Sequence, residues 1–206
     1  MIYIATTTIN KPTKALKLFA KNNNCKLIVA LDKKSKDFKL KNSIILTTKY
    51  QEKKWPKLSK LVGWNCIQRR NFAILEAYNR GAEIVALIDD DTIPGDRWIE
   101  NCVNTYETHP GLLGTIGLIF ENDTYGVLGE NRFGWDNNNT EVKKVDIVGH
   151  NWFFHRDLLS VFWRELPSVD ESFLVGEDIH FSHMIQKYTD MGTWVPPHPP
   201  EDRRLW

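Results

Sequence analysis

The sequence predicts an α/β protein with a mixed, mainly parallel central sheet flanked by helices, and with a small second sheet or hairpin in its C-terminal half. Two observations lead to this fold class. In residues 1–94, apolar runs rich in β-branched side chains alternate with segments of helical spacing in the order β-α-β-β-α-β, which favours a largely parallel sheet. Acidic residues also follow the second and fourth runs, at the edge where such sheets bind ligands.

The first half supplies the elements of this sheet in order. The basic stretch 49–65 contains Pro56 and Gly63 and has no clean period, so we expect a loop with one helical turn there. Gly81 is a suitable residue to follow a helix. The predicted strands cover residues 2–8, 25–32, 43–48 and 83–88, and the predicted helices cover residues 12–23 and 65–81.

The second half contains shorter strands and more glycine and asparagine. The tail 191–206 carries four prolines, which exclude a regular helix and predict an extended segment. The remaining elements are a helix at 95–110, a strand at 112–120, a hairpin or loop at 121–141, strand, turn and strand at 142–155, and helices at 156–163 and 177–190.

Composition restricts the class of partner. The 206 residues include 27 Lys and Arg against 26 Asp and Glu, a formal net charge of +1, which predicts neither a nucleic-acid partner nor strong attraction to an anionic membrane. The chain is long enough for one domain with a full core. The chain has eight Trp residues, several of them in polar stretches of the sequence, which suggests a surface on which sugar rings stack.

The cysteines and the hydropathy pattern predict a cytoplasmic protein without a membrane span. Cys25, Cys66 and Cys102 lie far apart and have no metal-ligand spacing, which suits a reducing compartment. The apolar N-terminus is too short for a signal sequence, and no run of about 18 apolar residues occurs. If the source is viral, the compartment would be the host cytoplasm.

Three consecutive aspartates follow the predicted strand at 83–88. Neighbouring carboxylates raise one another's pKa unless a cation or hydrogen-bond donors compensate them. A D-x-D pattern after an apolar strand suits a divalent cation bound to a diphosphate: Asp91 would be the direct ligand, with Asp89 directed at the ribose or a metal-bound water, and Asp90 the least assigned of the three. The alternative interpretation is a solvated acidic turn.

Two further groups extend this candidate site. Arg70 and Asn71 begin the helix before the aspartate strand, and Arg suits phosphate or a carboxylate partner; the alternative is a surface Arg pair. In "GED", Glu177 and Asp178 open a helix. One interpretation is structural, because acidic residues are favoured at the start of a helix. The other is catalytic: Asp178 would be a general base, and Glu177 would support the acceptor.

Together, "ALIDDDTIP", "RRN", "GHNWFFHRDLL" and "GED" resemble the motifs of GT-A fold nucleotide-sugar glycosyltransferases of the inverting type. The chain is also similar to the small glycosyltransferase domain of large algal viruses. The resemblance covers nearly the whole chain and implies a single Rossmann-like catalytic domain, residues 1–206. Residues 1–94 would form its nucleotide-binding half and residues 95–206 its acceptor-binding half. A further domain or partner would follow Trp206.

The resemblance also implies roles for individual residues and for a cofactor. Mn²⁺ or Mg²⁺ would bind at Asp91, and the donor would be a nucleotide sugar, with UDP favoured. The acceptor would be a glycan or glycoprotein. Thr6 and Thr7 would contact the nucleotide, Asp32 the base, His198 would complete the metal shell, and His150, Asn151 and Trp152 would contact acceptor or donor sugar. Their alternatives are structural: His198 in a proline-bounded loop, Trp152 in the core and Asn151 in a turn.

One departure and two rivals remain at this point. The second strand ends in "LDKKS" and not in a doubly acidic turn, which weakens the base-recognition role of Asp32. A nucleotidyltransferase would need a glycine-rich loop after the first strand, and "TTTINKP" has no glycine. The non-enzymatic rival is a domain that binds glycans or nucleotide sugars without turnover.

Overall fold

The computed structural model describes residues 1–120, 131–135, 137–165 and 176–206. It divides into two compact units, Met1–Ile93 and Pro94–Trp206. The division falls one residue from the predicted boundary between the two halves. Each unit is described by itself below.

The N-terminal unit is built on a parallel sheet of four strands. Strand β1 (Ile2–Thr8) pairs with β2 (Cys25–Leu31) on one side and with β4 (Ile84–Leu87) on the other. Strand β3 (Ser43–Leu46) pairs with β2, giving the order β3-β2-β1-β4. Because all four strands run in the same direction, their carboxyl ends meet at one edge, as the sequence predicts.

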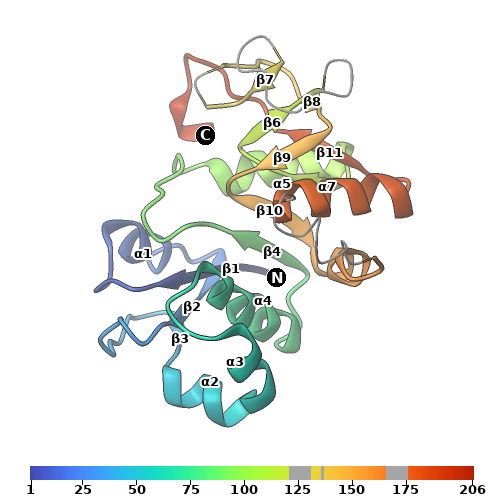
Figure 1. Cartoon of the computed structure of the whole chain (residues 1–206). Coiled ribbons are helices and arrows are strands. Elements are labelled where there is room, and N and C mark those ends of the chain that lie inside the picture. Colours follow the sequence, from blue (N-terminus) through green and yellow to red (C-terminus); the bar gives the residue numbers. More distant parts are fainter. Residues whose placement is uncertain (121–130, 136, 166–175) are drawn as a thin grey trace. The chain divides into compact units, whose positions relative to one another are not determined.

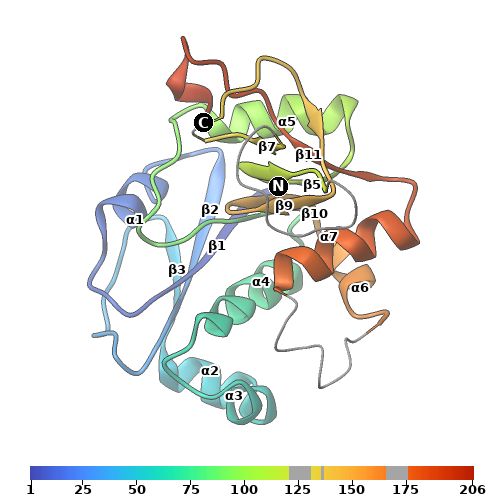
Figure 2. The same cartoon turned by 45° about the horizontal axis from the view of Figure 1, so that its top comes forward.

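Helices cover both faces of this sheet. Figures 1 and 2 show α1 (Lys14–Phe19) and α4 (Arg70–Asn79) on opposite faces. Leu16 and Phe72, one from each helix, are fully buried, as are most side chains of β1 and β2. Burial of a side chain of this size stabilises the folded state by about 1.5–3 kcal/mol. The two-sided core explains why β2 and β4 are largely apolar.

The predicted loop at 49–65 is wrong: it forms two helices, α2 (Thr48–Lys54) and α3 (Pro56–Val62). Thr47 caps α2 by accepting a hydrogen bond from the backbone N–H of Tyr50, and Pro56 is at the first position of α3, where proline is favoured. The residues that each helix buries fully are polar, Gln51 and Ser59. The pair therefore has no apolar period for sequence reasoning to detect.

The strands of the C-terminal unit form two sheets. They are β5 (Gly111–Leu113), β6 (Ile116–Leu118), β7 (Arg132–Phe133), β8 (Lys143–Lys144), β9 (Ile147–Gly149), β10 (Trp152–His155) and β11 (Gly192–Val195). The first sheet has the order β10-β5-β11-β8, with one parallel pair, β5 and β11, and two antiparallel pairs. The second sheet, β7-β6-β9, is antiparallel.

The single strand predicted at 112–120 is split between these two sheets. Gly114 marks the break: a Cβ added there would lie 2.8 Å from Cβ of Val148 and 2.9 Å from the carbonyl oxygen of Gly149. Thr115 then donates from both its backbone N–H and its Oγ1 to the carbonyl oxygen of His150. The chain crosses from one sheet to the other where only glycine fits. Most of the predicted hairpin at 121–141 lies outside the described residues, apart from β7.

Helices complete the C-terminal unit near the positions that the sequence predicts. They are α5 (Trp98–Thr108), the 3₁₀ turn η2 (Arg156–Leu158) continuing into α6 (Leu159–Phe162), and α7 (Glu177–Tyr188). The tail is extended through β11 and ends in the 3₁₀ turn η3 (Arg203–Leu205). None of the helices in the described parts of the chain is long and apolar enough to cross a membrane.

Candidate active site

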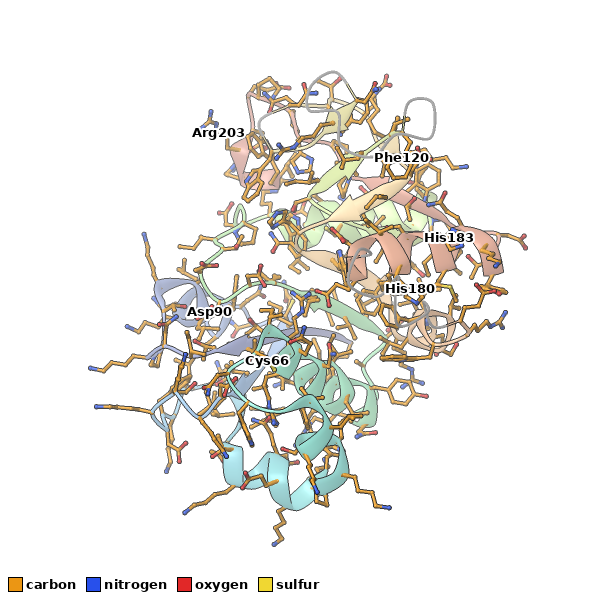
Figure 3. The ribbon with its side chains drawn as sticks, in the orientation of Figure 1. Cys66, Asp90, Phe120, His180, His183 and Arg203 are labelled. Atoms are coloured by element: carbon orange, nitrogen blue, oxygen red, sulfur yellow. The ribbon has the colours of Figure 1, made fainter. Side chains whose placement is uncertain are left out.

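The aspartate loop follows β4 and is attached to the end of β1. Asp90 Oδ2 accepts hydrogen bonds from Thr8 Oγ1 at 2.5 Å and from Asn10 Nδ2 at 3.3 Å. The carbonyl oxygen of Asp90 also accepts from Oγ1 of Thr13, the residue that caps α1. Figure 3 shows Asp90 beside this helix. The least assigned of the three aspartates is therefore the one that fixes the loop, and sequence reasoning missed its partner Thr8.

The other two carboxylates are differently placed. Asp89 Oδ1 lies 3.5 Å from Nη1 of Arg70, and the Asp89 side chain is 41% exposed against 13% for Arg70. Asp91 is exposed, and its carboxylate makes no hydrogen bond or ion pair with the described residues. Of the three charges, one is tied into the loop, one is partly neutralised by Arg70, and one remains open to solvent and to a cation.

Neighbouring arginines 69 and 70 have different functions. Arg69 is fully buried, and its guanidinium donates to the carbonyl oxygens of Gly63 and Ser59, to Ser59 Oγ and to Gln51 Oε1. It also lies 3.3 Å from the ring centroid of Trp64. Burial lowers the pKa of Arg69, although the negative charge of Asp32 acts to raise it. Arg69 is a structural residue, whereas Arg70, in the first turn of α4 with half-buried Asn71, reaches the aspartates.

The buried carboxylate of Asp32 holds a loop that follows α3. Its Oδ1 accepts from the backbone N–H of Asn65 at 2.7 Å, and its Oδ2 accepts from the backbone N–H of Cys66 at 3.2 Å. Asn65 has a positive φ of 60°, a conformation that needs local support in residues other than glycine. Recognition of a base by Asp32 stays a prediction, and the structure adds this structural function.

The two threonines predicted to contact the nucleotide lie in β1. Thr6 Oγ1 is 3.3 Å from the carbonyl oxygen of Thr7, and Thr7 Oγ1 donates to the carbonyl oxygen of Ala30 at 2.9 Å. Thr6 is buried and Thr7 half-buried. Both hydroxyl groups therefore donate to backbone carbonyl oxygens, and contact of either threonine with a nucleotide stays a prediction.

In the C-terminal unit, Asp178 lies against two glycines. Its Oδ1 accepts from the backbone N–H of Ile179 at 3.0 Å. A Cβ added at Gly176 would lie 2.6 Å from Oδ1, and one added at Gly149 would lie 3.5 Å from Oδ2. The carboxylate therefore lies over Gly176, at the start of α7, and beside the turn that follows β9. Glu177 is half-buried in the first turn of the same helix.

The turn beside Asp178 has an unusual backbone. His150 and Asn151 both have positive φ, 49° and 45°, and two consecutive left-handed non-glycine residues are typical of functional sites. The exposed ring of His150 lies 4.9 Å from that of Trp135, which also has a positive φ and is 39% exposed. Sequence reasoning missed Trp135, although "FGWDNNN" is a polar context for tryptophan. Trp152 instead is buried, with its ring 5.4 Å from Phe181.

His198 is 1% exposed and has a defined tautomer. Its Nδ1 lies 2.7 Å from the carbonyl oxygen of Pro196, which can only accept, so Nδ1 carries the proton. Burial lowers the pKa of His198 to about 4, and this hydrogen bond opposes the shift. The imidazole is therefore neutral, with its lone pair on Nε2, the form that binds a metal. Within the described residues, no three His, Cys, Asp or Glu side chains group as a metal site.

Comparisons with known proteins identify the fold. Searches of the sequence against family models and curated proteins give no match. Among solved structures, that of S. aureus TarS 1–349 in complex with UDP matches over 97% of this chain and 61% of that chain, with 14% identity and a TM-score of 0.55. The structure of TarS 1–349 alone matches over 95% of this chain and 60% of that chain, with 14% identity and a TM-score of 0.52. A197 from STIV matches over 95% of this chain and 80% of that chain, with 12% identity and a TM-score of 0.48.

This chain thus spans about three fifths of the TarS chains that it matches. TarS is a GT-A glycosyltransferase. The mixed α/β architecture, with its parallel strands flanked by helices and its small antiparallel sheet, is therefore a GT-A fold, as the sequence motifs predict.

Proposed function

We propose that this protein is a glycosyltransferase that moves a hexosyl group from a nucleoside diphosphate sugar to a hydroxyl of a glycan or glycoprotein. The observation that carries the proposal is the arrangement of the aspartate loop at the carboxyl edge of the parallel sheet of a GT-A fold. There Asp91 is open to solvent, while Asp89 lies beside Arg70. A UDP-linked donor is favoured because one TarS structure of similar fold was solved in complex with UDP.

The aspartate loop suits a divalent cation that arrives with the donor. Mg²⁺ and Mn²⁺ prefer oxygen ligands, and with nucleotides they commonly take one or two carboxylates and fill the other positions with phosphate and water. Asp91 and Asp89 would supply these carboxylates. Such an ion would neutralise charge on the leaving diphosphate. Arg70 adds positive charge beside Asp89 and orients that carboxylate.

Asp178 is the candidate general base. It would accept the proton of the acceptor hydroxyl as that oxygen attacks the anomeric carbon and the bond to the diphosphate oxygen breaks. A single displacement of this kind inverts the anomeric configuration. Two observations support this role: the carboxylate is half-buried, and it lies beside the turn of His150 and Asn151, whose backbone has positive φ.

A thermal-shift panel of UDP-, GDP- and dTDP-sugars with and without Mn²⁺ tests donor binding, because a ligand that binds only the folded state raises the melting temperature. We expect a shift with a UDP-sugar that requires the cation. Slow hydrolysis of the same donor with release of UDP would distinguish an enzyme from a binding domain. No shift with any nucleotide sugar would refute the proposal, and a product of retained configuration would refute the role of Asp178.

A further inference from the structure

The two units carry opposite formal charges. Residues 1–93 contain 18 Lys and Arg against 8 Asp and Glu, a net charge of +10, whereas residues 94–206 contain 9 against 18, a net charge of −9. The near-neutral total of +1 conceals this difference. All fifteen lysines of the N-terminal unit are exposed. The net charge of the whole chain predicts only weak attraction to anionic surfaces. The N-terminal unit, with a net charge of +10, should be attracted to them much more strongly.

Helices α2 and α3 carry five of these fifteen lysines against one acidic residue, Glu52. Lys49 and Lys53 are each two positions from buried Gln51, so they lie on the opposite side of α2. By the same geometry, Lys57 and Leu61 lie opposite buried Ser59 on α3. We call Lys49, Lys53, Lys57, Lys60 and Leu61 the α2–α3 surface. Its four lysines form no ion pair with the described residues, and Figure 3 shows nitrogen-tipped side chains extending outward from these helices.

This surface also exposes apolar side chains among the lysines. Leu61 is 83% exposed, and Ile67, which follows the next loop, is 49% exposed. The helices are held from beneath by Arg69, which binds both Gln51 and Ser59. The exposed side chains of the α2–α3 surface are therefore not needed to hold these two helices in place. Exposed lysines next to an exposed leucine are found on helices that lie on anionic lipid.

The chemistry favours lipid over nucleic acid. Readers of nucleic acid rely on arginine for bidentate contacts and on aromatic rings for stacking. In the N-terminal unit, Arg69 is buried, Arg70 faces Asp89, and Arg80 bonds with Glu76. The free cations are lysines, whose long stems can lie along a membrane interface while the ammonium groups meet phosphate.

The face that carries α1 is a less suitable alternative. It also has lysines, Lys14 and Lys17, and Leu18 is 41% exposed. However, Thr13 at the start of α1 contacts Asp90, so this side lies next to three aspartates that would repel anionic lipid. We propose that the α2–α3 surface docks this protein on an anionic lipid bilayer, with the lysines on the headgroups and Leu61 in the interface. This inference does not depend on the proposed enzyme activity.

Vesicle flotation with the full chain tests the inference. We expect binding to vesicles of phosphatidylcholine with 30% phosphatidylglycerol and none to phosphatidylcholine alone. The binding should weaken as salt is raised, because the Debye length shortens. Replacement of Lys49, Lys53 and Lys57 by Gln should weaken binding about 100-fold, since each lysine near such a surface contributes about 5-fold. Leu61→Ser should weaken it about 10-fold, because leucine then no longer enters the interface.

The matched control is the triple change of Lys14, Lys17 and Lys21 to Gln, which removes the same charge from the α1 region of the same unit. Equal losses in the two triple variants would overturn the inference, because net charge alone would then explain binding. Unchanged binding of Leu61→Ser, or binding to soluble polyphosphate but not to vesicles, would also overturn it. Melting temperatures near that of the wild type confirm that each variant is folded, since all these side chains are exposed.

Discussion

The Asp90 carboxylate accepts a hydrogen bond from Thr8 Oγ1, joining residues 82 positions apart in the sequence. Thr8 is the last residue of β1, and Asp90 follows β4. Because these strands are parallel neighbours, their ends lie side by side, and the bond fixes the loop that carries the other two aspartates. The contact separates a structural carboxylate from the carboxylates that are available to a ligand.

Substitution of Asp90 should mainly affect stability, whereas substitution of Asp91 should mainly affect donor binding. Asp90→Ala should lower the free energy of unfolding by about 1–3 kcal/mol, because Thr8 loses its partner in a half-buried position. Asp91→Ala should leave that free energy unchanged or slightly raised, since it removes one of three like charges, but should abolish cation-dependent donor binding. Urea unfolding and calorimetric titration of a UDP-sugar with and without EDTA measure the two effects. Unchanged donor affinity in Asp91→Ala would refute its metal role.

Replacement by lysine should lower the free energy of unfolding much more at Arg69 than at Arg70. Arg69→Lys should destabilise the protein by about 3 kcal/mol or more, because one ammonium cannot reach the acceptors that the buried guanidinium binds. Arg70→Lys keeps a cation beside the 41% exposed Asp89 and should destabilise the protein less than Arg69→Lys does. Chemical denaturation of both variants tests this. Similar losses in the two would contradict the division of roles.

Glu76 predicts a pH dependence of stability. Its buried carboxylate accepts hydrogen bonds from Lys54 at 2.6 Å and Arg80 at 2.7 Å. Burial alone would raise its pKa, but these two partners outweigh burial and the pKa is lowered. The stabilisation is therefore fully present above the unfolded value of 4.5 and is lost as pH falls through the lowered folded value.

The variant Glu76→Gln isolates this contribution. At pH 7 it should be less stable than the wild type, because glutamine cannot pair with two cations. Below pH 4.5 the difference should shrink as the wild-type carboxylate takes up its proton. Unfolding free energies measured from pH 7 down to pH 3 give the comparison. A difference that stays constant over this range would show that the charge of Glu76 does not contribute.

The position of Asp178 can be tested through its glycine neighbours. Asp178→Asn should lower kcat by about 10² to 10⁴ with the fold retained. Gly176→Ala should also lower kcat, because its new Cβ would lie 2.6 Å from Asp178 Oδ1 and displace the carboxylate. Gly149→Ala is the control, since its Cβ would make an ordinary contact of 3.5 Å with Oδ2. Full activity in Gly176→Ala would show that this carboxylate position is not required.

Much of the fold follows from local patterns in the sequence. Strands β2 and β4 are largely apolar because helices cover both faces of the sheet, and such runs are easy to recognise. Helices α2 and α3 were missed because their buried residues, Gln51 and Ser59, are polar and meet Arg69. The strand predicted at 112–120 was wrong because the close approach at Gly114 depends on residues about 35 positions away.

The candidate site shows the same distinction. The sequence by itself determined that three aspartates follow a parallel strand and that a second acidic pair opens a later helix. Only the tertiary structure decided that Asp90 bonds Thr8, that Arg69 is buried while Arg70 meets Asp89, and that Trp135 lies beside His150. Residue types and short spacings are local properties, whereas hydrogen-bond partners and burial depend on which distant segments the fold brings together.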